Sequence, residues 1–294
     1  MIINDSTLRA LFVGFRTEYQ NAFEGAPKDF EKIATTVPSA TKENVYPWLG
    51  QNTALREWIG ERVIQNLSVH KYAIENRKFE STIAISRDSV EDDTIGIYKP
   101  AVQELGRAAG THPDQMVFGL LKAGFSVPCY DGQYFFDTDH PVAGVSVSNL
   151  IAGAATPWYL MVTKRALKPL IWQVRRPYEF VHKDKLDDDN VFMREEFLYG
   201  VSARVNAGFG LWQMAVACKD ALTAANYAAA RAKILSFTSD VGEPLGLIPD
   251  LLVVPPSLEG AARKLLINDR NDAGASNEWA GSAELLVTPW LATA

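Results

Sequence analysis

The sequence predicts an α+β fold, in which helices and strands occupy different stretches of the chain. Three observations carry this prediction. The chain opens with an amphipathic helical pattern, an alternating strand pattern lies within residues 62–98, and a strand–helix–strand pattern lies near the C-terminus. A chain of 294 residues is long enough for one large domain or for two linked lobes.

The composition is that of a globular protein with a buried core, because 47% of the residues are hydrophobic and 22% are charged. No apolar run reaches the roughly 18 residues that a transmembrane helix needs, so no membrane contact is expected. The N-terminus lacks the basic and long apolar stretches of a secretory signal. Cys129 and Cys218 are the only cysteines, which fits a reducing, cytosolic site of assembly.

The net charge of −6 argues against a protein that binds DNA by affinity, since phosphate contacts dominate such binding and require a basic patch. One modest basic cluster is present. It consists of Lys164, Arg165, Lys168, Arg175 and Arg176. We expect this cluster to pair with acidic residues such as those of 184–189, within the chain or on a neighbouring copy, and the alternative is that it meets phosphate.

The first segment is predicted to be a helix, with Ser6 as its N-cap and with Gly25 and Pro27 ending it. Its apolar residues recur every three or four positions and therefore share one face. That face is formed by Leu8, Leu11, Phe12, Phe15, Tyr19 and Phe23. Packing on the same chain and packing on a neighbouring copy both stay open.

Residues 28–60 contain short extended pieces broken by prolines and glycines, which is typical of an arm laid over a surface. After them, apolar and polar residues alternate from Phe79 to Ser86, which indicates a strand. Val69, Tyr72 and Ile74 suggest a partner strand. We therefore predict a long two-stranded hairpin within residues 62–98.

Such a hairpin is marginal in isolation, so its apolar face needs a surface to cover it. We predict that a neighbouring copy supplies this surface, and that the acidic residues after the strand meet basic groups there. The predicted contact residues are Tyr72, Phe79, Ile83, Ile85, Asp88, Glu91, Asp92 and Asp93. The alternative is a hairpin folded back on its own sheet.

The remaining pattern continues the α+β assignment. A helix is predicted from Pro100, and Pro113 either starts a second helix or lies in a single long, kinked one. Residues 127–220 are rich in aromatic and β-branched residues and are predicted to form strands. The further expected elements are a helix over 223–235, a strand over 250–254, a helix through Leu266 and a strand over 284–287.

One constellation has the residue types of a metal site. Asp137, Asp139 and His140 place two carboxylates and an imidazole within four residues. The stretch follows an aromatic strand and precedes Pro141, and aspartates also form turns through bonds to the backbone. We favour the turn, and the alternative is a metal-dependent hydrolase that uses these three residues.

Other catalytic signatures are missing from the sequence. It contains no phosphate-binding GxxxxGK[ST] and no HExxH, and Arg204 replaces the final glycine of a nucleophile elbow that would begin at Gly200. We therefore predict that the protein is not an enzyme, with no catalytic residue, no cofactor and no metal.

Five stretches, in this order and spacing, resemble the Mu-like phage major head subunit family. They are NDSTLRALFVGFRTEYQNAFEGA (4–26), YDGQYFFDTDHP (130–141), TPWYLMVTKRALKPLIWQVRRPYEF (156–180), GLWQMA (210–215) and PDLLVVPPSLEGAARKLL (249–266). Together they span almost the whole chain.

The resemblance implies the HK97-type phage capsid fold, whose parts can be assigned to this sequence as expectations. An N-terminal arm with the amphipathic helix would occupy residues 1–61, and the extended β-hairpin, or E-loop, residues 62–98. A peripheral domain with a long spine helix would occupy residues 99–155. An axial domain, with return strands to the peripheral domain, would occupy residues 156–294.

The resemblance also implies a function, that of a structural virion protein. Copies would self-assemble as hexamers and pentamers into an icosahedral head shell that encloses double-stranded DNA by closure, without sequence-specific binding. Scaffolding, portal and head-completion proteins would be its partners, and a short arm before the hairpin implies that the scaffold is a separate protein. The subunit would be located in the virion after assembly in the host bacterial cytoplasm. A tail-tube subunit is a further alternative.

Overall fold

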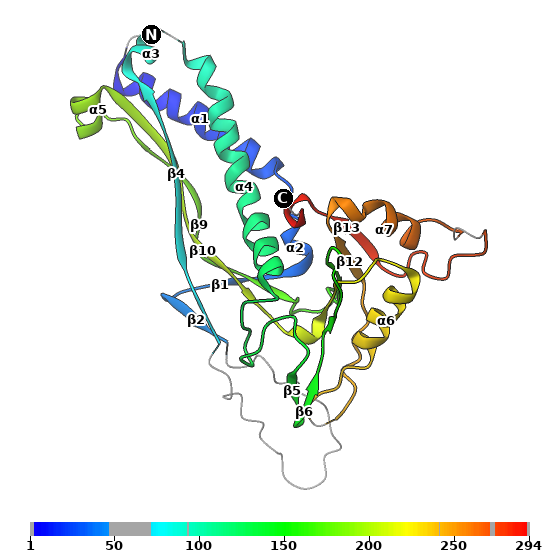
Figure 1. The fold of residues 1–294 in the computed structure, drawn as a ribbon. Coiled ribbons are helices and arrows are strands. Elements are labelled where there is room, and N and C mark those ends of the chain that lie inside the picture. Colours follow the sequence, from blue (N-terminus) through cyan, green and yellow to red (C-terminus); the bar gives the residue numbers. More distant parts are fainter. Residues whose placement is uncertain (1–2, 47–71, 93, 241, 271–273, 293–294) are drawn as a thin grey trace.

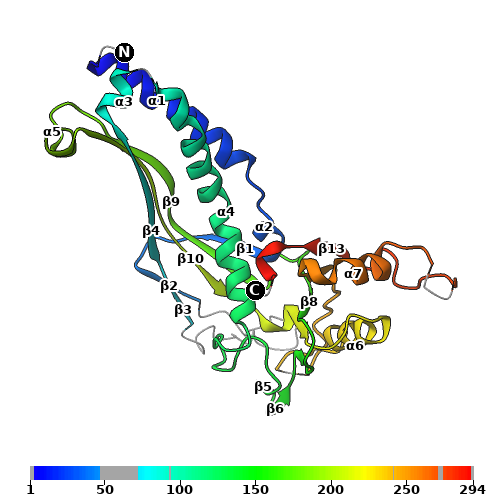
Figure 2. The same cartoon turned by 45° about the horizontal axis from the view of Figure 1, so that its top comes forward.

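The computed structural model describes residues 3–46, 72–92, 94–240, 242–270 and 274–292. Within these residues, two sheets lie at different places along an elongated molecule, and two long helices cover one face of the first sheet (Figures 1 and 2). None of the described helices is long and apolar enough to cross a membrane. Helices and strands are both plentiful, as predicted.

The first sheet has four strands in the order β1–β9–β10–β4. Its strands are β1 (Ala34–Pro38), β9 (Leu170–Lys183), β10 (Glu196–Phe209) and β4 (Arg77–Ser86). β10 runs antiparallel to both of its neighbours, whereas β1 runs parallel to β9. The predicted arm, residues 1–61, therefore contributes the strand β1 to this sheet, and its residues 47–61 lie outside the described residues.

The second sheet has five strands in the order β13–β12–β8–β11–β7. They are β13 (Glu284–Val287), β12 (Leu251–Val254), β8 (Trp158–Met161), β11 (Ala215–Cys218) and β7 (Leu150–Ile151). α7 (Glu259–Leu266) connects the parallel strands β12 and β13, and α6 (Ala224–Leu235) packs beside β11. The strands and helices predicted for this part of the chain are confirmed.

Shorter elements complete the part of the chain that the structure describes. They are α2 (Phe30–Ile33), β2 (Glu43–Val45), β3 (Ala73–Glu75), α3 (Arg87–Glu91), β5 (His140–Val142), β6 (Val145–Val147) and α5 (Asp189–Arg194). Four 3-10 turns span Thr94–Tyr98, Trp212–Met214, Pro256–Leu258 and Pro289–Leu291.

The predicted N-terminal helix is confirmed as α1 (Asp5–Gly25), although its N-cap is Asn4 and not Ser6. The Asn4 side chain accepts hydrogen bonds from the backbone N–H groups of Ser6 and Thr7, at 3.0 and 2.9 Å. Thr7 accepts from the backbone of Asn4 in return, which completes a capping box. Both residue types cap well, so only the position of Thr7 distinguishes them.

The apolar face of α1 packs on its own subunit, which decides between the two interpretations left open by the sequence. Leu8, Phe15 and Tyr19 are buried, and Leu11, Phe12 and Phe23 are partly buried, in a cluster shared with α4 and the first sheet. The Phe15 ring lies 5.1 Å from that of Tyr199 in an edge-on arrangement. Such aromatic contacts add to the stability that burial provides.

The predicted helix after Pro100 is one continuous helix, α4 (Lys99–Ala123), with Pro113 inside it. α1 approaches it closely at two glycines (Figure 1). A Cβ atom on Gly106 would lie 2.4 Å from the Tyr19 carbonyl oxygen, and one on Gly110 would lie 2.5 Å from the Ala26 Cβ. The sequence Gly-Arg-Ala-Ala-Gly therefore sets the distance between the two helices.

The predicted hairpin within residues 62–98 is wrong in its pairing. β4 does form a strand as expected, but it pairs with β10 over ten residues, from Arg77 to Ser86. β3 pairs with β2 instead, in an antiparallel ribbon. Buried Asn76 separates β3 from β4, and its amide donates to Ser39 and to two backbone carbonyls. Residues 62–71 lie outside the described residues.

The close approach at Gly106 generates a stability prediction with a matched control on the same helix. Gly106→Ala should destabilise the subunit by about 1–3 kcal/mol, because the added methyl group meets backbone that cannot move freely. Gly119→Ala should be neutral or stabilising by about 0.5–1 kcal/mol, since nothing lies within 4 Å of its Cβ position. Urea unfolding of both variants measures this, and equal midpoints would contradict the packing argument.

A second prediction concerns Asp114 on α4, which is buried and accepts the backbone N–H of Phe30 at 2.7 Å. Burial is the main reason that its pKa rises from 3.8 to about 6. The folded subunit therefore keeps a proton that the unfolded chain releases, and this contribution to stability is lost as the pH rises from 4 through 6.

Asp114→Asn should remove that dependence. Between pH 4 and pH 7 the unfolding free energy of the wild type should fall by on the order of 2 kcal/mol relative to the variant. Urea midpoints measured across this range test the slope, and parallel pH profiles for the two proteins would contradict it.

Candidate assembly surfaces and a buried histidine network

The apolar residues predicted to contact a neighbouring copy lie against their own subunit. Ile85 is buried beneath α1 and α4, and Ile83 and Phe79 are partly buried there. The Tyr72 hydroxyl accepts the backbone N–H of Phe209 at 2.8 Å. The premise that this face needs an external cover is therefore wrong, because the helices of the same chain already cover it.

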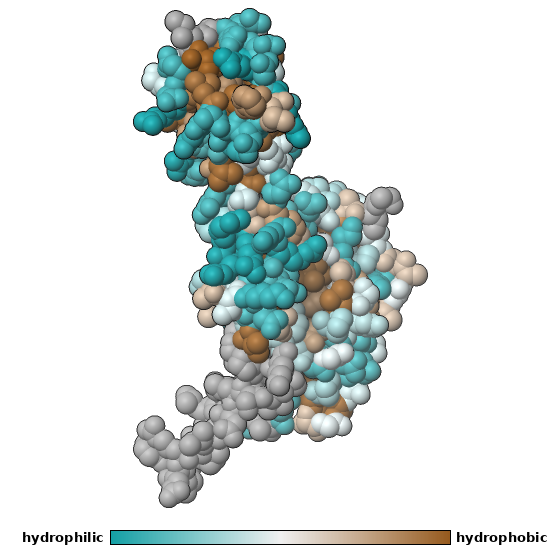
Figure 3. All heavy atoms as spheres, turned by 90° about the vertical axis from the view of Figure 1, so that its left-hand side faces the viewer, coloured by the Kyte–Doolittle hydropathy of each residue, from teal (hydrophilic) through white to brown (hydrophobic). Residues whose placement is uncertain are grey.

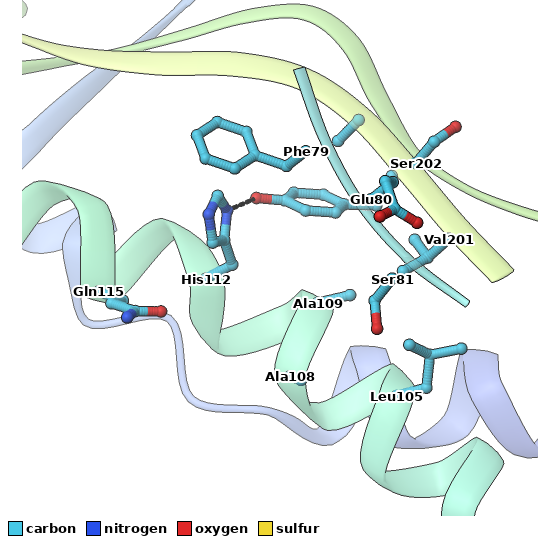
Figure 4. Close-up of a pocket in the computed structure, with 12 residues that line it drawn as sticks. Phe79, Glu80, Ser81, Leu105, Ala108, Ala109, His112, Gln115, Val201 and Ser202 are labelled. Carbon is cyan, nitrogen blue, oxygen red and sulfur yellow. Dashed lines mark hydrogen bonds between the residues drawn. The ribbon is translucent and has the colours of Figure 1, made fainter. Parts of the chain in front are cut away.

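Phe79 also lines a small cavity between α4 and the first sheet, with a volume of about 180 Å³ (Figure 4). Its walls are mostly apolar, and include Leu105, Ala109 and Val201. His112 lies at one side, with its Nδ1 atom 2.5 Å from the Tyr178 hydroxyl. Burial and then Arg77 lower the pKa of His112, so the imidazole is neutral near pH 7.

The predicted acidic cluster forms the short helix α3 after β4. Ser86 caps this helix, and Asp88 is exposed in its first turn. Glu91 already forms an ion pair with Arg87 of the same helix, at 2.9 Å. Asp92 is exposed at the end of the helix, and Asp93 lies outside the described residues. An intersubunit role for these residues stays a prediction.

The turn between β9 and β10 forms a projecting tip that carries α5 (Figure 1). Phe192 is 83% exposed and Met193 is 74% exposed, which is unusual for large apolar side chains. Buried Asp184 holds the base of the tip, because it accepts hydrogen bonds from His182 at 2.6 Å and Tyr199 at 3.0 Å. Figure 3 shows hydrophobic residues at this end of the molecule.

Three cations form a row across the first sheet. Lys78 lies opposite Arg204, which in turn lies opposite Arg176 on β9. Lys78 and Arg176 are exposed, and no carboxylate in the described part of the chain lies within 4.0 Å of these three cations. Like charges directly opposite on neighbouring strands destabilise a sheet, so this row is costly to the isolated subunit.

His140 is fully buried, but its partner is not one of the two predicted aspartates. Its Nδ1 atom lies 2.7 Å from the Asp131 carboxylate, and its ring stacks on Trp212 with centroids 4.0 Å apart. The Cys129 thiol donates to the other Asp131 oxygen at 3.0 Å. Cys129-Tyr130-Asp131 was present in the sequence, but nothing local indicated that it meets His140.

Asp137 makes the turn that the sequence favoured. Its two oxygens accept the backbone N–H groups of Tyr134 and Thr138, at 3.2 and 2.7 Å. Asp139 is exposed. Asp137 and Asp139 interact with each other, but among the described residues neither belongs to the group of possible ligands around His140. This removes the geometric basis of the hydrolase alternative.

Cys129, Asp131 and His140 do place three possible ligand atoms within 4.8 Å of one another. Two ligands on a tetrahedral zinc ion, each about 2.0–2.3 Å from it, stand roughly 3.3–3.8 Å apart. The contacts of 2.7 and 3.0 Å are instead hydrogen bonds. Burial raises the pKa of the Cys129 thiol, which favours the protonated donor over a metal-binding thiolate.

The described fold is an elongated sheet under two long helices, joined to a second α/β lobe. The structure resembles a chain from the procapsid of bacteriophage JBD30 with a TM-score of 0.87 and 44% identity. The match covers 98% of this chain and 100% of that one. The predicted HK97-type capsid fold is confirmed.

The sequence comparisons identify the family. The model of the Mu-like prophage major head subunit gpT matches residues 8–291. The major capsid protein of Escherichia phage Mu is 45% identical over 99% of this chain and 100% of its own length. The Mu-like prophage FluMu major head subunit of Haemophilus influenzae is 44% identical over 90% of each chain. This chain belongs to the Mu-like major head subunit family.

Membership confirms the resemblance found in the sequence, and with it the assignment as a major head subunit, a structural protein of the phage head shell. In a structural subunit, the side chains around His140 form a buried polar network that holds the segment 129–149 against Trp212.

The His140 network generates a prediction that separates it from the neighbouring turn. Asp131→Asn should lower the unfolding free energy by about 2–3 kcal/mol, because it weakens charge-assisted hydrogen bonds inside the protein. Asp137→Asn is the matched control and should cost less than about 1 kcal/mol, since asparagine makes similar turn bonds.

The difference in unfolding free energy between the two variants should depend on pH. Burial alone would raise the pKa of Asp131, but hydrogen bonds from His140 and Cys129 hold it below its usual value. The stabilisation is therefore present above about pH 4 and is lost as the pH falls through the lowered pKa. Denaturant unfolding at pH 7 and pH 3 tests both parts, and equal effects of the two substitutions at pH 7 would contradict the assignment.

Proposed function

We propose that copies of this chain assemble as hexamers and pentamers into a closed icosahedral head shell that encloses double-stranded DNA. The observation that carries the proposal is the family match over residues 8–291, together with the fold shared with a procapsid chain. The subunit is a building block of the shell, so its stability and its contacts with other copies determine its function.

The charge of the chain supports enclosure without affinity. A net charge of −6 gives a weakly repulsive surface, so DNA is retained because the shell is closed and not because phosphates are bound. We propose that the subunit is not an enzyme. The arrangement of the buried His140 network as a set of hydrogen bonds supports this, as does the description of the relatives as structural head proteins.

We also propose that assembly takes place in the cytoplasm of the host bacterium and requires proteins beyond the subunit itself. A separate scaffolding protein, a portal and head-completion proteins are the expected partners. The JBD30 relative comes from a procapsid, which supports a pathway through a precursor shell. Buried thiols at Cys129 and Cys218 are consistent with a reducing site of assembly.

The central test is the form of the assembled protein. Full-length protein, concentrated and examined by light scattering and electron microscopy, should give closed shells, because hexamers and pentamers together generate a closed surface. Scaffolding protein from the same phage is added in a parallel sample to lower the barrier to assembly.

Open tubes or isolated stacked rings would favour the tail-tube alternative. A species that stays monomeric at high concentration in every salt condition, with and without scaffold, would contradict the proposal. A chelator control checks the metal question, and shells should form equally well in its presence.

A further inference from the structure

The cationic row on the first sheet is a surface that the subunit does not complete by itself. Lys78, Arg204 and Arg176 lie side by side on three strands, without an ion-pair partner among the described residues. The Nε atom of Arg204 is buried and has no hydrogen-bond partner in the described structure. An anionic partner would offset both the repulsion and the unsatisfied donor.

The tip of the β9–β10 turn has the complementary chemistry. Asp187 and Asp189 are exposed, and no described cation lies within 4.0 Å of either carboxylate. Beside them, Phe192 and Met193 present apolar surface to solvent. Arginine suits both features, because its guanidinium pairs with carboxylates and also lies over aromatic rings.

Within one chain the row and the tip cannot meet. Arg176 is followed by seven residues of β9 before the strand ends at Lys183, and an extended strand of that length spans about 23 Å. Figure 3 shows hydrophobic residues at the end of the molecule that carries α5 and hydrophilic residues below them. The tip therefore needs the row of another molecule.

We propose that the acidic tip of one subunit, centred on Asp187, Asp189 and Phe192, docks on the cationic row Lys78–Arg204–Arg176 of a second copy. This contact joins two different surfaces of the same chain and is therefore head-to-tail, the kind of interface that closes into rings. The proposal rests on the proposed function and deepens it, since it names the surfaces through which copies associate.

The first experiment reverses the charges on each side in the full-length protein. Lys78→Glu with Arg176→Glu changes the row, and Asp187→Lys with Asp189→Lys changes the tip. Both row positions are exposed, and the new glutamates would flank Arg204, so the isolated subunit should fold at least as well as the wild type. Arg9→Glu with Arg16→Glu, on the exposed face of α1, is the charge-matched control.

Each reversed variant should lower the yield of shells by about tenfold or more, which is the effect of losing 1.4 kcal/mol per contact. The control should assemble like the wild type. The variant that carries all four changes should recover shells to within a few-fold of the wild type, because the charges are again opposite. Circular dichroism and urea midpoints confirm that every variant is folded.

A second measurement does not depend on shells. Arg176→Cys with Asp187→Cys in one chain should give a ladder of disulfide-linked oligomers under mild oxidation, whereas either cysteine alone should not extend beyond dimers. Cys129 and Cys218 are buried and do not compete. If wild-type protein forms no shells but the ladder appears, the proposed function fails while the contact stands.

The contact is wrong if both reversed variants assemble like the wild type. It is also wrong if they fail, the four-change variant does not recover, and the ladder is absent. In that case, binding to immobilised duplex DNA is compared between the wild type and the Lys78→Glu, Arg176→Glu variant. If only the wild type is retained, phosphate groups, and not a second copy, occupy the row.

Discussion

The packing of α1 on α4, and of both on the first sheet, is the interaction on which the rest of the subunit depends. Gly106 and Gly110 allow backbone to approach backbone, so the two helices act as one rigid layer. That layer covers Ile85 and Tyr199 on a sheet whose strands are up to 14 residues long, and Phe15 of α1 lies against the Tyr199 ring. Without the layer, a long apolar sheet face would be exposed and prone to aggregation.

The same layer explains why the molecule can be elongated and still have a core. β9 and β10 extend beyond the region that α4 covers and end in the α5 tip (Figure 2). The base of the tip is held by polar bonds to buried Asp184, not by a thick hydrophobic core. A projecting element with a fixed base and exposed apolar residues is suited to contact another molecule, because little conformational entropy is lost on docking.

Local patterns predicted the elements of this fold well where the element and its partner are close in sequence. The strand, helix and strand that became β12, α7 and β13 are an example, since a parallel crossover follows from their order. The face of α1 was also correct, because helical periodicity identifies a buried face directly. Periodicity does not identify the partner, so it could not decide that α1 packs on its own chain.

The pairings that the sequence did not predict have the same physical origin. β4 was recognised as a strand, yet it pairs with β10, more than 100 residues later, and not with the adjacent β3. A period of two says only that one face is buried, and either strand would satisfy it. The sequence also did not identify the partner of His140. The turn at Asp137 is local and was predicted, whereas Asp131 is brought to His140 by the fold.

Charge connects these observations to the behaviour expected of a shell subunit. An overall net charge of −6 keeps copies apart in solution, while the row of Lys78, Arg204 and Arg176 concentrates the opposite charge in one place. Repulsion between copies is spread over the surface and is screened by salt. An ion pair in a docked interface is screened less, because it is partly shielded from the salt. A subunit built in this way disfavours random association and still permits one orientation. In the proposed contact, the row of one copy would receive the acidic tip of the next, and such a defined contact favours an ordered shell over disordered aggregates.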